Sequence, residues 1–122
     1  MDKYFNQIND FLFSLLKENE ILKTSIWGEK SQFIRLNNSK VRQTGIIDDM
    51  SYSLCLISNN RQVSCSSTLN GNIIYDKLHV TKILNTLRED ITRVPEDPYI
   101  VYPDSKLSSN EKNKGSLLDF NK

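Results

Sequence analysis

The sequence predicts an α+β domain: an antiparallel sheet of four to five strands built from hairpins, with two helices packed on one face. Apolar residues recur at helical spacing near the start of the chain and again after position 76. Between these segments, apolar and polar residues alternate, as they do in strands with one covered face. Asparagines separate the alternating segments, and asparagine tolerates the positive φ of tight hairpin turns.

The first helix is predicted over Tyr4 to Leu16, because an apolar stripe with helical spacing runs through this segment. A strand is predicted to follow and to end at Ile26 and Trp27, just before Gly28. The stripe consists of Phe5, Ile8, Leu12 and Leu15, widened by Phe11 and Leu16.

Two hairpins are predicted next. The first joins Gln32–Leu36 to Lys40–Ile47, and the second joins Ser51–Ser58 to Arg61–Thr68. Asp48-Asp49 is expected to form the turn between the hairpins, since aspartate is common in turns.

The turn positions predict the cross-strand neighbours. A turn at Asn37-Asn38 places Ile34 opposite Val41 and Arg35 opposite Lys40. In the second hairpin, a two-residue turn at Asn59-Asn60 places two apolar pairs on one face, Leu56 with Val63 and Leu54 with Cys65.

The second helix is predicted from Asp76, its N-cap, to Arg93, before Pro95. Residues 1–101 are therefore interpreted as one domain, and 102–122 as a polar tail or the start of a following domain. The apolar stripe of the helix consists of Val80, Ile83, Leu84, Leu87 and Ile91, and the late apolar residues of the tail are Leu117, Leu118 and Phe120.

Charge and composition exclude several function classes. The chain has 122 residues and a formal net charge of +1, which argues against a general nucleic-acid or membrane surface. An RNA-binding sheet needs several exposed aromatic residues, and only Phe33 and Tyr52 are candidates. The start of the chain has neither a leader-like cleavage site nor an apolar run of membrane-spanning length, so a cytoplasmic protein is expected.

The sequence offers no catalytic constellation. His79 is the only histidine, which excludes a two-histidine zinc motif, and neither a Gly-x-Ser-x-Gly motif nor a phosphate-binding glycine loop is present. Cys55 and Cys65 are interpreted as reduced, packed thiols rather than a disulfide or metal pair. We therefore expect no catalytic residue, metal ligand or cofactor site in this chain.

The first hairpin is the candidate site because cations gather on it. One interpretation is a solvated edge whose cations discourage sheet-to-sheet pairing. The other is a strand edge that receives a peptide or an acidic partner, with main-chain hydrogen bonds for affinity and arginines for carboxylates. The predicted contact residues are Phe33, Arg35, Asn38, Lys40, Arg42 and Gln43.

Four segments follow one another along the chain: "SQFIRLNNSKVRQTG", "YSLCLISNNRQVSCSSTLNG", "YDKLHVTKILNTLRED" and "VPEDPYIV". Together they cover Ser31 to Val101. In order and spacing they resemble the N-terminal domain of the TldD/PmbA family of zinc metallopeptidases, also called the modulator of DNA gyrase family.

The resemblance implies a non-catalytic front domain of a peptidase that works as a homodimer or heterodimer on peptide substrates. In the family, zinc is held by a later domain with a His-Glu-x-x-x-His motif, and this chain contains no such motif. The chain is therefore expected to be inactive alone and to serve assembly of domains or subunits and guidance of the peptide. The alternative is a stand-alone interaction module that binds a partner protein through its sheet edge.

Overall fold

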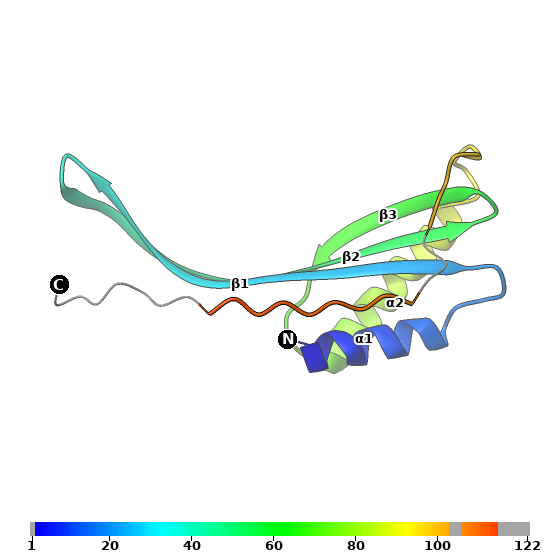
Figure 1. Ribbon diagram of the computed structural model, residues 1–122, viewed down its shortest axis with the longest axis horizontal. Helices are drawn as coiled ribbons and strands as arrows, with labels where there is room; N and C mark the ends of the chain where they lie inside the picture. Colours follow the sequence, from blue (N-terminus) through cyan, green and yellow to red (C-terminus); the bar gives the residue numbers. More distant parts are fainter. Residues whose placement is uncertain (1, 103–105, 115–122) are drawn as a thin grey trace.

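A computed structural model of the chain describes residues 2–102 and 106–114, and it shows an α+β fold with two helices and one three-stranded antiparallel sheet (Figure 1). The strand order in the sheet is β1-β2-β3. The elements are α1 (Asp2–Ser14), β1 (Ile21–Asn37), β2 (Lys40–Ser58), β3 (Arg61–Thr68) and α2 (Ile73–Asp90).

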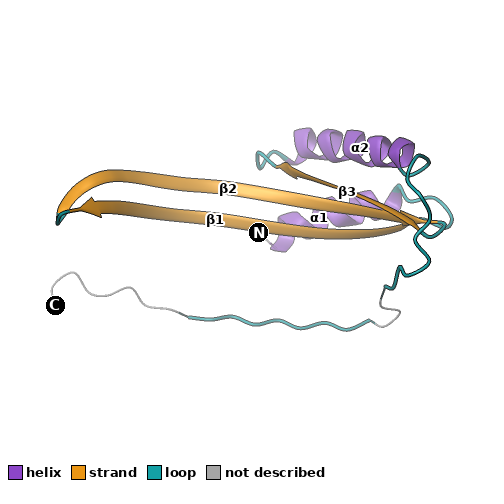
Figure 2. Cartoon of the chain, turned by 90° about the horizontal axis from the view of Figure 1, so that it is seen from above, coloured by secondary structure: helices purple, strands orange, loops and turns teal. Residues whose placement is uncertain are grey.

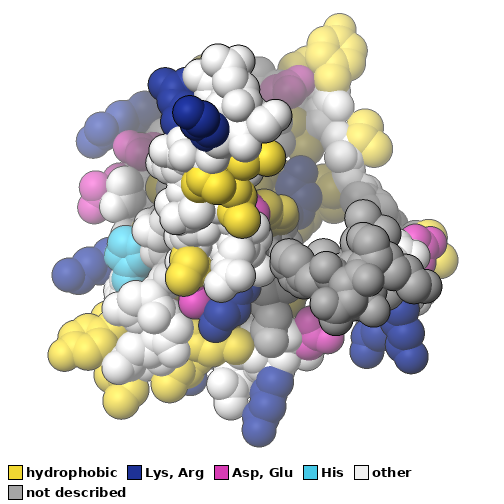
Figure 3. All heavy atoms as spheres, turned by 90° about the vertical axis from the view of Figure 1, so that its left-hand side faces the viewer, with side chains coloured by type: hydrophobic (Ala, Val, Ile, Leu, Met, Phe, Trp, Pro, Cys, Tyr) yellow, Lys and Arg dark blue, Asp and Glu magenta, His cyan; other side chains and the backbone are white. Residues whose placement is uncertain are grey.

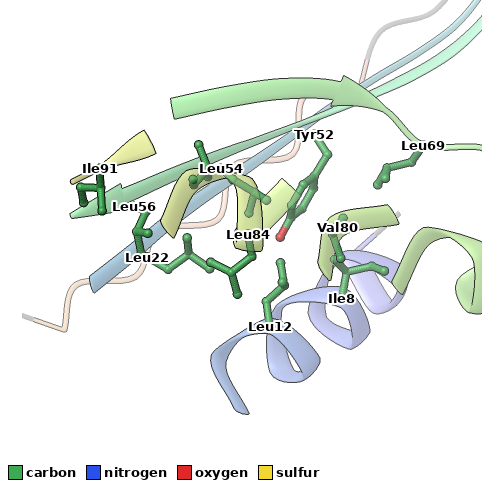
Figure 4. Packing of buried hydrophobic residues seen from close by; sticks show 11 residues of the cluster. Ile8, Leu12, Leu22, Tyr52, Leu54, Leu56, Leu69, Val80, Leu84 and Ile91 are labelled. Carbon is green, nitrogen blue, oxygen red and sulfur yellow. The ribbon is translucent and has the colours of Figure 1, made fainter. Parts of the chain in front are cut away.

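The core lies between the two helices and one face of the sheet. Alternate residues of β2, namely Tyr52, Leu54 and Leu56, point toward the helices and are buried (Figure 4). Their partners from the helices include the predicted apolar stripes, which are confirmed: Ile8 and Leu12 of α1, and Val80, Leu84 and Leu87 of α2. The same face of β3 completes the layer, and the predicted pairs Leu56–Val63 and Leu54–Cys65 are both present.

The prediction of four to five strands is wrong, because two expected breaks lie inside continuous strands. Gly28 pairs with Met50 in the middle of the β1–β2 ladder. Asp48-Asp49 does not form a turn; these residues lie in β2 opposite Lys30 and Glu29. Pairing with a long partner strand outweighs the local turn preference of aspartate, and Lys30 Nζ lies 3.5 Å from a carboxylate oxygen of Asp48.

The turn at Asn59-Asn60 is confirmed, since both residues have positive φ and Ser58 pairs with Arg61. The first turn is displaced by one residue from the prediction. It is formed by Asn38 and Ser39, whose φ angles are 50° and 60°.

This displacement corrects the register of the first hairpin. Arg35 lies opposite Gln43 rather than Lys40, and Ile34 lies opposite Thr44 rather than Val41. The ladder contains an irregularity after Arg35, where the strand partners shift by one residue and Arg42 becomes the extra residue of a β-bulge.

Both helices begin earlier than predicted. α1 covers Asp2–Ser14, and α2 begins at Ile73 and ends at Asp90. The N-cap of α2 is Asn72, whose side-chain oxygen accepts hydrogen bonds from the backbone N–H groups of residues 74 and 75. Asp76 is therefore not the N-cap; it is a buried residue of the first helical turn.

The β1–β2 hairpin is much longer than the layer that covers it. β3 pairs with β2 only from Ser51 to Ser58, and the two long strands continue alone to their turn. We call residues 28–50 the arm, and Figure 2 shows it reaching well beyond both helices. No helix in the described part of the chain is long and apolar enough to cross a membrane.

Of the residues after Tyr102, only 106–114 are described, and they do not belong to this layer. Residues 106–114 have no helix or strand and are exposed. The late apolar residues singled out in the sequence, Leu117, Leu118 and Phe120, lie outside the described residues.

Candidate functional site

All six residues predicted to contact a peptide or partner lie on the outer half of the arm. Phe33 and Arg35 are in β1, Asn38 is in the turn, and the remaining three are in β2. The register places Lys40 opposite Asn37 at the tip. Arg42 and Gln43 line a hollow together with Arg35 and Leu36.

The structure brings three of these residues into direct contact. A guanidinium nitrogen of Arg35 donates a hydrogen bond of 3.1 Å to the side-chain oxygen of Gln43. The Arg35 guanidinium also lies 5.2 Å from the centroid of the Phe33 ring, within the range of a cation–π interaction. These contacts hold Arg35 flat on the arm, where its remaining donors are available to an acidic group.

The Phe33 ring covers Gly45, its partner in the ladder. A Cβ added at Gly45 would lie 2.5 Å from the Cε1 atom of Phe33, which is too close for two carbon atoms. The glycine therefore makes room for the ring, an arrangement known to stabilise strands that contain glycine.

Replacing Gly45 by alanine is expected to displace the Phe33 ring and to release Arg35 from it, while the helical core stays intact. NMR spectra report this directly, through the ring resonances of Phe33 and the Hε resonance of Arg35. Thr44→Ala is the matched control, because Thr44 is the neighbouring residue and points to the other side of the strand. Unchanged Phe33 resonances in the Gly45 variant would show that the ring does not cover the glycine.

The arm has a second feature that the sequence did not predict, an exposed apolar face. Pair partners share a face of the sheet, so Ile34, Leu36, Val41 and Ile46 continue the side on which the helices lie. Their side chains are 62–71% exposed, because neither helix extends over them. We call these four residues the inner face of the arm.

Seen from the end at which the arm projects, Lys and Arg side chains lie beside hydrophobic side chains on the nearer surface (Figure 3). The sequence signal for the inner face was the alternation itself. Alternation predicts that the apolar face of a strand is covered. The inner face of the arm is uncovered because β3 and both helices end before they reach it.

β2 also has a free main-chain edge along the arm. The backbone N–H of Leu69 donates to the carbonyl oxygen of Met50, which is the last bond between β2 and the segment after it. Main-chain groups of alternate residues point to the same edge, so those of Asp48, Ile46 and Thr44 point to the side where β3 has ended. This edge can accept an extended peptide by strand addition.

His79 forms a polar pair that resembles part of a catalytic arrangement. Its Nε2 atom lies 2.7 Å from the hydroxyl oxygen of Ser67, and both belong to the surface beside the end of β3. A nucleophile and base need a third group that orients the base, and no hydrogen bond of the described residues gives His79 such a partner. His79 is an exposed residue of α2.

Within 2–102 and 106–114, no three His, Cys, Asp or Glu side chains form a group that could hold a metal ion. Cys55 and Cys65 are free thiols. The zinc implied by the family resemblance thus has no fitting set of ligands in the described part of the chain.

Comparisons of the chain with family models, with curated proteins and with solved structures find no match.

Proposed function

We propose that this chain is a non-catalytic assembly domain, the front part of a TldD/PmbA-like zinc metallopeptidase, and that the inner face of its arm packs against another domain or subunit of that enzyme. The single observation that carries the proposal is the exposed apolar row on a hairpin that projects from an otherwise complete core. The family part of the proposal rests on the order of the segments between Ser31 and Val101.

Energetics favours a covered inner face. Fully burying one aliphatic side chain is worth about 1.5–3 kcal/mol, so four that are roughly two-thirds exposed represent several kcal/mol of unused burial. A two-stranded ribbon is also marginally stable by itself in water, and a third layer over the arm would stabilise it. A partner with an apolar surface would bury the four side chains and would also form the third layer over the arm.

Guidance of a peptide is the second part of the proposed role. The free edge of β2 offers main-chain hydrogen bonds to an extended chain, and Arg42 of the same strand, with Arg35 of β1 beside it, offers guanidinium donors for carboxylates. No catalytic step is assigned to this chain, because the zinc-binding residues would belong to another part of the enzyme.

The alternative function, a stand-alone module that binds a partner protein, is favoured by the same free edge of β2. Strand addition at this edge does not depend on the rest of a peptidase. The two functions differ in what should bind: a metal-motif region of the family in the first, an unrelated extended segment in the second.

The inner face can be tested by polar substitution. A variant with Ile34, Leu36, Val41 and Ile46 all replaced by threonine is expected to lose at least tenfold in affinity for the purified His-Glu-x-x-x-His region of a TldD/PmbA-family protein from the same organism. Threonine keeps the β preference of the strands while removing apolar surface. Light scattering after size-exclusion chromatography, with titration calorimetry, measures the association.

The matched control replaces Ile74 and Leu78, two exposed apolar residues of α2, with threonine. This variant should bind as the wild type does. If the wild-type chain ignores the metal-motif region, the peptidase assignment is wrong and the interaction module gains weight. Equal losses in both variants would show that general surface apolarity, and not the arm, drives the association.

A further inference from the structure

We infer that the other face of the arm is a self-complementary surface that binds a second copy of this chain, with the two arms antiparallel. We call this surface the outer face. It concerns residues that point away from the helices, so it does not depend on the peptidase assignment or on the inner face. Its main residues are Glu29, Asp49, Ile47, Phe33, Arg35 and Lys40, with Arg42 beside Arg35.

An acidic row marks the base of the outer face. Glu29 and Asp49 lie directly opposite each other in the ladder. Like charges in this position destabilise a pair of strands. Among the described residues neither carboxylate forms an ion pair, since Lys30 bonds Asp48 on the inner side of the arm. Within the part of the chain that the structure describes, one side-chain hydrogen bond reaches the row, from the Ser31 hydroxyl to a carboxylate oxygen of Glu29 at 2.6 Å.

A basic row marks the outer part of the same face. Arg35 lies six positions along β1 from Glu29, and the bulge brings Arg42 next to it. Lys40 follows on the same face at the tip. In the described residues none of the three forms a salt bridge. The face therefore carries two uncompensated charge clusters of opposite sign, about 20 Å apart at the usual rise of a strand.

The middle of the face is apolar and half-buried. Ile47 pairs with Ser31, and one row further out Phe33 pairs with Gly45. The centre of the surface lies between these two rows, midway between the acidic and basic clusters.

A two-fold axis through this centre would place each charge cluster opposite the cluster of the other sign in a second copy. It places the acidic row of one arm over Arg35 and Arg42 of the second copy, and the reverse contact follows by symmetry. The same operation lays Ile47 against Phe33, and it brings Trp27, which is 56% exposed, toward Lys40 of the other copy. A partner of a single charge sign would satisfy one cluster and oppose the other, so a second copy fits better than an acidic or a basic ligand.

The interface is a narrow ribbon, near the lower limit of about 1,200 Å² for specific complexes, so a reversible dimer is expected. Because its charges lie at the surface, added salt should weaken it.

Charge reversal tests the arrangement. In sedimentation velocity at low salt, Glu29→Lys with Asp49→Lys should weaken dimerisation at least tenfold, and Arg35→Glu with Arg42→Glu should do the same. An equimolar mixture of the two variants should restore a dimer of wild-type strength, because each reversed cluster then faces its opposite. The matched control exchanges Lys30 and Asp48 (Lys30→Asp with Asp48→Lys), which keeps their ion pair on the inner side and should leave dimerisation unchanged.

Three outcomes would overturn the inference. One is a wild-type chain that remains monomeric at about 0.5 mM protein, where association of micromolar strength is readily seen. Another is failure of the mixed variants to associate while circular dichroism shows both folded. The third is a dimer that tolerates the charge reversals and is lost in the threonine variant of the inner face, which would assign the contact to the other side of the arm.

Discussion

Replacing Asp76 with alanine is expected to lower the free energy of unfolding by about 3 kcal/mol, because the change removes the acceptor of three hydrogen bonds. The Asp76 side chain is only 3% exposed. Its oxygens accept from the hydroxyl of Tyr4 in α1 and from the backbone N–H groups of Asn70 and Gly71, at 3.2 and 3.0 Å. One carboxylate thus ties the first helix, the loop after β3 and the start of α2 together.

The electrostatics of this cluster supports a structural role for Asp76. Burial raises the pKa of the Tyr4 hydroxyl well above its usual range, and the hydrogen bond to the Asp76 carboxylate raises it further. Tyr4 therefore stays protonated and donates throughout the neutral range. The carboxylate also lies in the first turn of α2, where the helix dipole favours negative charge.

Urea unfolding followed by far-ultraviolet circular dichroism measures the Asp76→Ala effect. Tyr4→Phe is the matched control: it removes one donor and leaves the two backbone bonds, so a loss of about 1 kcal/mol is expected. A difference below 1 kcal/mol between Asp76→Ala and the wild type would mean that water replaces the carboxylate without cost. The cluster would then not be what fixes the loop.

Local patterns were sufficient to predict the core. Each helical stripe is set by residues three and four apart, and the short hairpin by the asparagines at 59 and 60, which tolerate positive φ at little cost. Nothing distant in the sequence competes with these preferences. Their spacing identifies the buried residues of both helices that pack on the sheet, namely Ile8, Leu12, Val80, Leu84 and Leu87.

The long strands could not be predicted in the same way, because their continuity is decided by pairing. Gly28 and Asp48-Asp49 are breaks by local preference, but Gly28 is paired with Met50, and Asp49 and Asp48 are paired with Glu29 and Lys30 in the next two rows of the same ladder, so both strands continue through this region. The register at the tip depended on a choice between two turns that both contain asparagine. The chain uses Asn38 and Ser39, and a bulge at Arg42 absorbs the shift.

The geometry of the candidate site could not be predicted from the sequence. The cations were visible in the sequence, whereas the contact of Arg35 with Gln43 follows from the corrected register. The exposure of Leu36 and Ile46 was hidden for a different reason. An alternating strand has the same pattern whether its apolar face is covered or open, and the difference depends on how far the helices and β3 extend.

The ion pair between Glu20 and Arg88 should give the second large effect, a loss of about 2–3 kcal/mol for Arg88→Ala at neutral pH. The side chains are 9% and 18% exposed, and two guanidinium nitrogens each lie 2.8 Å from a carboxylate oxygen of Glu20. Arg88 also donates to the backbone carbonyl of Leu15, at 2.7 Å. The substitution would therefore leave a nearly buried carboxylate and the end of α1 without their partner.

The contribution of this pair should depend on pH in a defined direction. The hydrogen bond from Arg88 lowers the pKa of the Glu20 carboxyl below its ordinary value of 4.5, against the opposing effect of burial. For a lowered pKa, the stabilisation is fully present above pH 4.5 and is lost as pH falls through the pKa of the folded protein. The difference in unfolding free energy between the wild type and Glu20→Gln should therefore shrink on acidification from pH 7 to about pH 3.

An exposed ion pair of the same chain provides the control. Arg93 and Asp90 lie 3.9 Å apart with side chains 76% and 49% exposed, and Arg93→Ala should change stability by less than about 0.5 kcal/mol at any pH. If both arginine variants lost the same stability, or if the Glu20→Gln difference stayed constant with pH, charge pairing would not be what joins α2 to the loop after α1. Packing of the Arg88 stem would then be the cause, and Arg88→Met would retain the stability of the wild type.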